Sequence, residues 1–211
     1  MSYFRTQAIA CPRCGKDNTK QIWESMNAEK NPEAKEQLID GTLFNYDCEC
    51  GFAAAIDFNF LYRDPANKAV LYYVKEQDRA EARETLMDMI KQDEDENSFR
   101  IVTSQNVLRE KALIFSMGLD DRMIELIKTM YLVQAQNQYA GARNALFYVD
   151  GDKWMLQING PRPLIAQISR EQYDSMKEDF ANALEVHGDV DFDIDYAWAH
   201  EFLKRCGIIP G

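Results

Sequence analysis

Two short cysteine turns constrain the fold of this chain more than any other feature of its 211 residues. The first reads CPRCG at positions 11–15, and the second reads DCECG at positions 47–51. In turns of this type two thiolates converge on one metal ion, and the glycine can take a positive φ that directs backbone N–H groups at the sulfurs. Two such turns on separate β-hairpins form a zinc ribbon, whose thiolates at ~2.3 Å leave no open coordination position. The two turns therefore predict a structural zinc site.

The predicted ligands are Cys11, Cys14, Cys48 and Cys50. The second turn is spaced Cys-x-Cys, so Asp47, which precedes Cys50 by three residues, is an alternative fourth ligand. Cys48 is favoured because structural zinc sites use sulfur and imidazole far more often than carboxylate. Core or surface cysteines without a metal remain the alternative to the site as a whole.

A redox role for the first turn is disfavoured. A thioredoxin-like pair would stand at the start of a helix in a βαβ unit, and CPRCGKDNTKQIW at 11–23 has no helical pattern. The fifth cysteine, Cys206, precedes a helix-ending glycine and lies near Phe202 and Leu203, so it is expected in the core.

The charge of the chain narrows the class of partner. With 24 Lys and Arg against 35 Asp and Glu, the net charge is −11, which repels phosphate backbones and makes a nucleic acid an unfavourable partner. A protein is the expected partner. No segment approaches the ~20 apolar residues of a membrane helix, and the first residues lack the apolar stretch of a signal peptide. We therefore expect a cytoplasmic protein that contacts no membrane.

Strand and helix signals separate along the chain, which predicts an α+β fold. The first ~75 residues contain short strand-like runs broken by turns, with one short helix that begins at Pro32 and ends at Gly41. A charged helix at 76–96, a strand at 98–103 and two further helices up to residue 133 follow. The expected first domain, 1–135, is a zinc-ribbon-like β unit with packed helices.

The expected second domain, 136–211, is a β-meander with two helices. Asp150-Gly151 joins two strand-like runs, as in a type I′ hairpin, and a third strand is predicted at 164–169. An amphipathic helix at 170–187 and a last short helix, stopped by Gly207, complete this part.

Three longer motifs accompany the cysteine turns: LFNYDCECGF at 43–52, FLYRDPANKAVLYYV at 60–74 and GLDDRMIELIK at 118–128. Together with the turns they resemble the bacterial CpXC domain family over about residues 9 to 131. The resemblance implies a zinc-ribbon-like core but no activity. It carries over the motif residues Cys11, Pro12, Cys14, Gly15, Cys50 and Gly51. At the second turn the chain departs from the family, whose first cysteine aligns with Asp47 and whose proline position aligns with Cys48.

Other polar clusters carry weaker signals. Alternate aspartates at 189–195 could hold a cation, but the calcium-loop pattern fails because Ile194 stands where glycine is needed and His200 where glutamate is needed. An edge strand with one acidic face is the better interpretation. His187 and His200 are near no nucleophile motif and are expected at the surface or at helix ends.

Three functions remain open from the residues alone. The first is a non-enzymatic module that binds another protein while zinc fixes its hairpins. The second is a metal-dependent enzyme that uses carboxylates such as Asp64 and Asp121, although salt bridges to Arg63 or Arg122 and helix capping also explain these acids. The third is a nucleic-acid-binding ribbon with the basic residues Arg13, Lys16 and Lys20. The residues therefore leave enzymatic activity undecided, and no catalytic residue is predicted.

Overall fold

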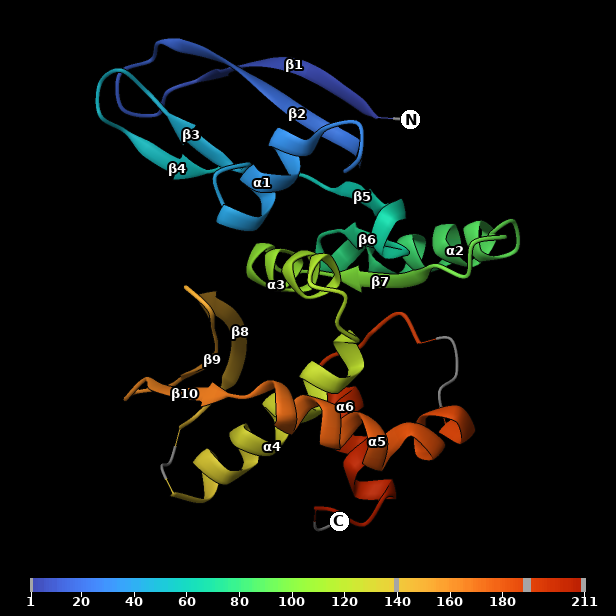
Figure 1. Ribbon diagram of the computed structural model, residues 1–211. Coiled ribbons are helices and arrows are strands. Elements are labelled where there is room, and N and C mark those ends of the chain that lie inside the picture. The colour runs from blue at the N-terminus through green and yellow to red at the C-terminus, as the bar shows by residue number, and fades with distance from the viewer. Residues whose placement is uncertain (1, 139–140, 188–190, 210–211) are drawn as a thin grey trace. The chain divides into compact units, whose positions relative to one another are not determined.

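The computed structural model describes residues 2–138, 141–187 and 191–209. The chain divides into two compact units, Met1–Ala112 and Leu113–Gly211, and Figure 1 labels their elements. This division lies before the domain boundary expected after residue 135. Compactness alone does not demonstrate independent folding, so a domain boundary at 135/136 stays a prediction.

The first unit combines strands with short helices, as its sequence predicts. In chain order its elements are β1 (Tyr3–Ala10), β2 (Asp17–Asn27), α1 (Pro32–Asp40), β3 (Asn45–Asp47), β4 (Ala53–Ala55), β5 (Phe60–Asp64), β6 (Ala69–Tyr73), α2 (Arg79–Ile90) and β7 (Ser98–Val102), with 3₁₀ turns at Pro65–Asn67 and Glu76–Asp78. Helix α3 (Gln105–Ser116) follows and contains the division between the units.

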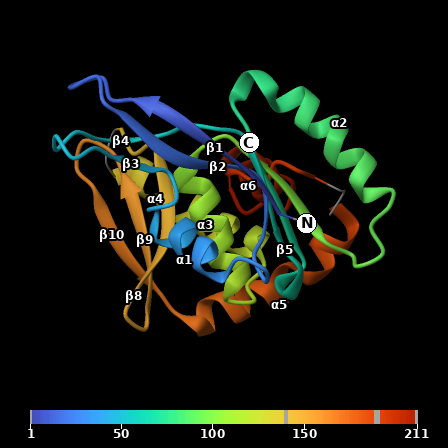
Figure 2. The ribbon, with the colours of Figure 1, turned by 90° about the horizontal axis from the view of Figure 1, so that it is seen from above.

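The main sheet of the first unit has the strand order β1-β2-β5-β6-β7. The pairs β1–β2 and β5–β6 are antiparallel, whereas β2–β5 and β6–β7 are parallel. Figure 2 shows β1 and β2 running side by side as a long hairpin. Strands β3 and β4 form a separate antiparallel hairpin. The two hairpins that carry the cysteine turns therefore belong to different sheets.

Helix α1 begins and ends where its sequence predicts. Pro32 occupies the first turn, where its missing N–H has no helical partner to lose. Gly41 closes the helix with φ +89°, and its N–H donates to the Gln37 carbonyl. A Cβ at Gly41 would lie 2.5 Å from the guanidinium carbon of Arg109, which donates to the carbonyls of Ile39 and Asp40. The positive φ therefore favours glycine here, and any Cβ would also displace the Arg109 guanidinium.

Aromatic side chains form much of the core of the first unit. Phe44 contacts Phe58, Phe60 and Tyr73, with ring centroids 5.0 to 6.1 Å apart. Phe60, Tyr62 and Tyr73 are buried, and Phe58 and Tyr72 are half-buried. Such pairs add ~0.5–1.5 kcal/mol beyond the burial of their area. The aromatic residues of these strands therefore mostly pack inside.

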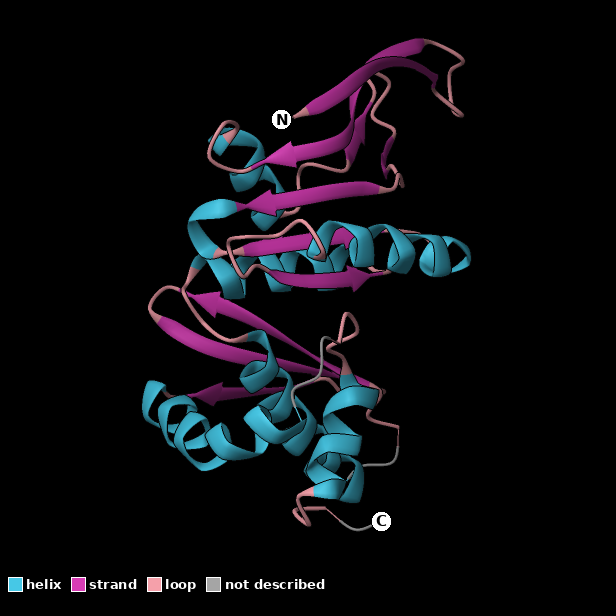
Figure 3. Ribbon diagram, turned by 90° about the vertical axis from the view of Figure 1, so that its right-hand side faces the viewer, coloured by secondary structure: helices cyan, strands magenta, loops and turns pink. Residues whose placement is uncertain are grey.

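The second unit has the predicted meander. Its elements are α4 (Asp121–Gln138), β8 (Asn144–Asp150), β9 (Lys153–Asn159), β10 (Leu164–Ile168), α5 (Arg170–His187) and α6 (Tyr196–Arg205). The three strands are antiparallel in the order β8-β9-β10, and Figure 3 shows them together with the helices of this unit. Gly151 has φ +62° at the first central position of the β8–β9 turn, whereas the second central residue, Asp152, has no positive φ, so the turn is of type II′ and not of the expected type I′. The hairpin, the third strand and both later helices are confirmed.

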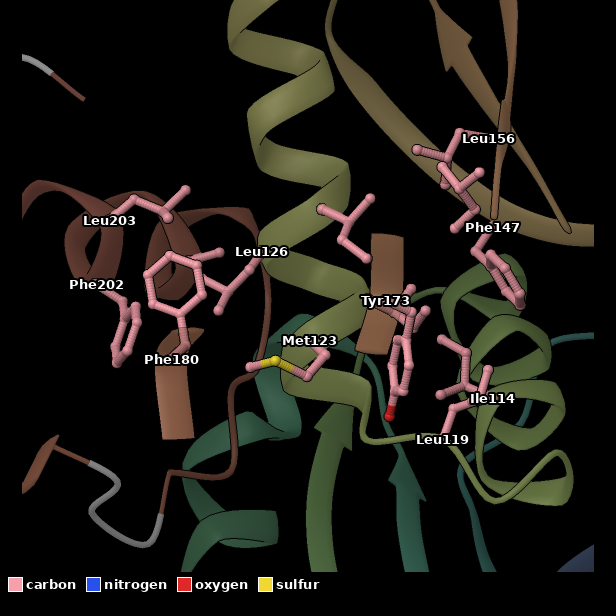
Figure 4. Close-up of a cluster of buried hydrophobic side chains, with 14 of the residues drawn as sticks. Ile114, Leu119, Met123, Leu126, Phe147, Leu156, Tyr173, Phe180, Phe202 and Leu203 are labelled. Atoms are coloured by element: carbon pink, nitrogen blue, oxygen red, sulfur yellow. The ribbon is translucent and has the colours of Figure 1, made fainter. Parts of the chain in front are cut away.

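One face of the meander packs against helices. Its buried residues include the cross-strand pairs Ala145↔Ile158 and Phe147↔Leu156, which alternate with more exposed positions. Figure 4 shows how side chains from the strands and helices meet in this core. The labelled members are Ile114, Leu119, Met123, Leu126, Phe147, Leu156, Tyr173, Phe180, Phe202 and Leu203. The meander thus obtains a core that a three-stranded sheet cannot form alone.

Two predictions about this part of the chain were wrong. Helix α4 continues to Gln138, beyond residue 133, where this helix was expected to end. The edge strand expected over 189–195 is absent from its described residues, 191–195, whereas 189 and 190 lie outside the described part. Asp191 accepts the N–H of Asp193, and Asp195 caps α6 by accepting the N–H of Trp198. These local side-chain hydrogen bonds compete with a strand ladder.

Candidate metal centre

The first cysteine turn closes the β1–β2 hairpin. Ala10 pairs with Asp17, and Cys11–Lys16 forms the loop between them. The N–H of Cys11 donates to the Lys16 carbonyl at 2.9 Å, and the N–H of Gly15 donates to the Cys11 carbonyl at 2.8 Å. Gly15 has φ +75°, which a Cβ would disfavour. The turn is thus held by two backbone hydrogen bonds of Cys11.

The second turn repeats this construction at the end of the β3–β4 hairpin. Asp47 pairs with Ala53, and the N–H of Cys48 donates to the Phe52 carbonyl at 2.9 Å. The N–H of Gly51 donates to the Cys48 carbonyl at 2.8 Å, and its φ is +80°. The two turns therefore share one local design despite their different cysteine spacing.

The two turns bring four sulfurs together. The Sγ atoms of Cys11 and Cys50 are 3.7 Å apart, those of Cys14 and Cys48 are 3.6 Å apart, and all four lie within 4.8 Å of one another. Sulfurs on a tetrahedral metal with bonds of ~2.3 Å lie ~3.8 Å apart. The cluster therefore has the dimensions needed to hold a metal ion. Each close sulfur pair joins one hairpin to the other.

The cluster is half enclosed. Cys11 and Cys48 are buried, whereas Cys14 and Cys50 are exposed. Tyr46 is buried beside them, and a small apolar shell of Ile9, Phe52 and Ile56 packs against this group. The surrounding apolar core is small, so the hairpin ends have few apolar contacts to hold them together.

Asn18 is the residue near the cluster that sequence patterns missed. Its Nδ2 donates to the Cys48 sulfur at 3.4 Å and to the Tyr46 hydroxyl at 2.8 Å. The Tyr46 hydroxyl in turn donates to the Ile9 carbonyl at 3.2 Å. Donors of this kind orient and stabilise a metal-bound thiolate. Asn18 lies outside both turns, and no spacing rule identifies it.

Hydrogen bonds prepare part of the cluster for thiolate formation. The backbone of Cys50 donates to Cys48 and lowers the pKa of that thiol to about 6. Burial raises the pKa of Cys11, but backbone hydrogen bonds from Cys14 and Arg13 outweigh it and lower the value. A backbone hydrogen bond from Phe52 lowers the pKa of Cys50, but burial and the adjoining thiols raise it to about 12. Neighbouring thiols thus oppose the ionisation of Cys50. A bound cation would remove this opposition, because it stabilises every thiolate at once.

Asp47 is not part of the sulfur cluster. It is exposed on β3, and the group of potential ligands in the described residues consists of Cys11, Cys14, Cys48 and Cys50. The structure therefore brings Cys48 to the position at which the family resemblance would place Asp47.

Asp64, a candidate for the enzyme hypothesis, belongs to a buried ion pair. Its Oδ2 accepts from Lys35 Nζ at 2.6 Å, from the Tyr62 hydroxyl at 3.0 Å and from Asn67 Nδ2 at 2.9 Å. The expected partner was Arg63, which instead points a guanidinium nitrogen at the Met89 sulfur. Burial raises the pKa of Asp64, but these donors, Lys35 foremost, lower it overall. The contacts describe a structural carboxylate.

Replacing Lys35 should destabilise the protein in a pH-dependent way. Lys35→Ala leaves a carboxylate of 1 % exposure without its cation, and we expect a loss of ~1.5–3 kcal/mol in the free energy of unfolding near pH 7. Because the folded pKa of Asp64 is lowered, its contribution is present above the unfolded pKa of ~3.9 and is lost as pH falls through the folded value. The free energies of unfolding of Lys35→Ala and of the wild type should therefore converge as the pH falls into the acid range.

Urea titrations from pH 7 to pH 3 measure this effect, with the exposed Lys75→Ala as the matched control. A constant difference between Lys35→Ala and the wild type across that range would contradict the assignment.

The other acids of the enzyme hypothesis lie elsewhere. Asp121 is buried in the first turn of α4, in the second unit, whereas Asp64 belongs to the first. The Arg122 guanidinium pairs with Asp120, whose carboxylate also caps α4 by accepting the Arg122 N–H. The carboxylate that caps this helix is therefore that of Asp120. Arg122, the expected partner of Asp121, forms its salt bridge with Asp120.

The remaining candidates with described side chains are not part of the cluster. Cys206 packs against the core of the second unit, as expected. The His200 ring lies 5.6 Å from the Tyr196 ring on α6. His187 ends α5, and its side chain lies outside the described part of the structure.

The three basic residues near the first turn contact the second hairpin. Lys16 pairs with Glu49, the Arg13 guanidinium lies 5.6 Å from the centre of the Phe52 ring, and Lys20 Nζ lies 5.8 Å from the centre of the Tyr46 ring. These contacts link the two cysteine hairpins to each other. Across the described residues, no helix combines the length and apolarity needed to cross a bilayer.

Comparison with known proteins identifies the family. The family model described as CpXC protein matches residues 9–128, which include both cysteine turns and more than half of the chain. Neither a curated protein nor a solved structure matches the chain. The matched residues contain the four-sulfur cluster, the buried Asp64 ion pair and the start of α4. The chain belongs to the CpXC family.

Proposed function

We propose that this chain is a cytoplasmic protein-interaction module, without enzymatic activity, in which a zinc ion stabilises the two cysteine hairpins. The observation that carries the proposal is the cluster of four cysteine sulfurs contributed equally by two hairpins. The metal would act as a clamp between segments that belong to different sheets.

Zinc is the metal that best fits this donor set. Thiolates are soft ligands, and a tetrahedral site of four cysteines is typical of structural zinc. The separations of 3.6 and 3.7 Å between sulfurs are close to the ~3.8 Å of such a site. Free thiols persist in the reducing cytoplasm, which supports that location for the protein.

The same donor set argues for a structural role. Four protein ligands leave no position for a substrate or an activated water, whereas catalytic zinc sites keep one open. Strands β3 and β4 have three residues each, and an isolated hairpin of this length is marginally stable at best. A metal clamp would supply the stability that the small apolar shell lacks.

A protein is the partner that the charge favours. The net charge of −11 opposes a polyanion, and the basic residues beside the first turn already contact the second hairpin. The carboxylate of Asp64 is engaged by Lys35, Tyr62 and Asn67, so no contact of that group favours the enzyme alternative.

Affinity capture with a metal-deficient control tests the proposal. The wild-type chain should carry a single zinc ion by elemental analysis and should recover the same proteins repeatedly from a native lysate. The variant Cys14→Ser/Cys50→Ser changes two exposed ligands and should lose both the zinc and those proteins. Recovery of the chain alone in replicate captures, or identical partners with the variant, would count against the proposal.

A further inference from the structure

The first unit contains a groove of about 710 Å³ bordered by β2, α1 and β3. Binding sites for ligands commonly enclose ~300–1,000 Å³. The residues that line it include Lys20 and Gln21 of β2, Gln37 of α1, and Asn45 and Asp47 of β3. Figure 1 shows these three elements.

The groove follows the edge of β2. Consecutive residues of a strand point to opposite faces, so a groove that both Lys20 and Gln21 line must run along an edge. The other edge of β2 is occupied by β1, which pairs Gln7↔Lys20 and Thr6↔Gln21. Strand β5 pairs with β2 only at Ser25–Asn27. Within the described residues, the edge of β2 that faces the groove therefore has no strand partner at 17–24.

Strand β3 borders the same groove and is also paired on one side only. Its partner is β4, through Asn45↔Ala55 and Asp47↔Ala53, and the two strands form a sheet of their own in the described structure. Asn45 and Asp47 project from the face opposite the buried Tyr46 and line the groove. The groove is thus bordered by the unpaired edge of β2 and by one face of β3.

The metal centre holds these two strands in place relative to each other. Cys11 and Cys14 lie in the β1–β2 turn, and Cys48 and Cys50 follow β3, so the cluster joins the two borders of the groove at one end. The hydrogen bond from Asn18 to the Tyr46 hydroxyl adds a second link there. The width of the groove therefore depends on the same contacts that form the metal centre.

An unpaired strand edge presents N–H and C=O groups that bind an extended peptide. We propose that the groove binds an extended segment of another protein, which adds as a strand to the unpaired edge of β2 and lies against the face of β3. This proposal rests on the proposed function as an interaction module and specifies the form of the partner. The backbone of the segment supplies most of the contacts, so its sequence is constrained mainly by side chains that face α1.

The lining favours a polar segment without a strong net charge. Lys20 and Lys30 are balanced by Glu33 and Asp47, so a polyanion or a polycation would meet like charges. In the described part of the chain, the side-chain amides of Gln21, Gln37 and Asn45 make no hydrogen bond and can donate or accept.

A displayed library of peptides of about ten residues, extended at ~3.3 Å per residue, provides the probe for the zinc-loaded full chain. Selected peptides are then measured against Gln37→Trp, which places a bulky side chain in the groove, and against Glu36→Trp, an exposed neighbour on the same helix that does not line it. We expect Gln37→Trp to weaken binding at least ~10-fold through the clash. Glu36→Trp should leave binding unchanged. Zinc content and circular dichroism verify that both variants are folded.

Two further readouts need no variant of the chain. Methylation of alternate peptide nitrogens should abolish binding in a pattern of period two, because only alternate N–H groups face β2. Bound peptide should also slow hydrogen exchange at Lys20–Trp23. Any of three results would overturn the proposed binding of a peptide in the groove: a library without binders, binders that tolerate Gln37→Trp, or protection from exchange that is confined to β1. If partners captured from lysate do not compete with the peptides, the groove is not the binding site, and the proposal of the groove fails. The proposed function as an interaction module would still hold.

Discussion

Removal of zinc with a strong chelator is expected to lower the melting temperature of the protein substantially. The four thiolates meet only in the folded chain, so the binding energy of the metal is part of the folding energy. Zinc-finger peptides, which have almost no other core, set an upper scale of ~10–16 kcal/mol. The effect here should be smaller, because the aromatic core around Phe44 and Phe60 forms without metal contacts.

Removal of zinc should destabilise the cysteine turns before it destabilises the rest of the protein. Hydrogen exchange should accelerate first at 11–16 and 48–52, where the apolar shell is small, whereas amides of the meander should keep their protection. Calorimetry before and after chelation, with zinc content measured on the same samples, provides the measurement, and added zinc should restore the transition. An unchanged melting curve in protein that has lost its zinc would falsify a structural role for the metal.

Replacement of Cys48 should abolish tight zinc binding, whereas replacement of Asp47 should not. The Cys48 sulfur lies 3.6 Å from that of Cys14, and its pKa is lowered to about 6, so it is a ready thiolate ligand. A serine hydroxyl is harder, is protonated at neutral pH and leaves three thiolates for the metal. Asp47 is exposed and lies outside the cluster, so Asp47→Asn should bind zinc as the wild type does.

Zinc stoichiometry and competition with a chelator measure both variants. Cys48→Ser should release its zinc at chelator concentrations that leave the wild type loaded. Asn18→Ala removes the donor to the Cys48 sulfur. Its zinc affinity should lie between those of Cys48→Ser and the wild type, ~10–100-fold below the wild type. The ligand assignment fails if Asp47→Asn loses the metal while Cys48→Ser keeps it.

Local signals in the sequence predicted most of the elements correctly. Pro32 and Gly41 bound α1, and Gly151 lies in the turn of the β8–β9 hairpin. Each of these signals acts through a hydrogen bond or a backbone preference within a few residues. The structure agrees at these positions because no distant contact competes with them.

Signals failed where a local pattern had more than one solution. The aspartates of 191–195 alternate with buried Phe192 and Ile194, as a strand would require, but their carboxylates bond nearby N–H groups and shape a loop instead. Helix α4 was expected to end at residue 133, because the few apolar residues of the polar stretch that follows keep no regular period. Propensity alone could not separate these outcomes.

The sequence by itself determined that this protein has two cysteine turns of one design, an α+β composition and an acidic surface. These properties depend on residue type and on spacing within a turn or a helix. Tertiary structure alone decided which distant segments meet. It paired β2 with β5 in parallel and brought Cys14 beside Cys48. It also placed Lys35, and not the adjacent Arg63, as the cation that binds Asp64. The physical reason is that the sequence carries no local signal for such contacts, since their stability comes from burial and pairing that exist only after the chain has closed the loops between them.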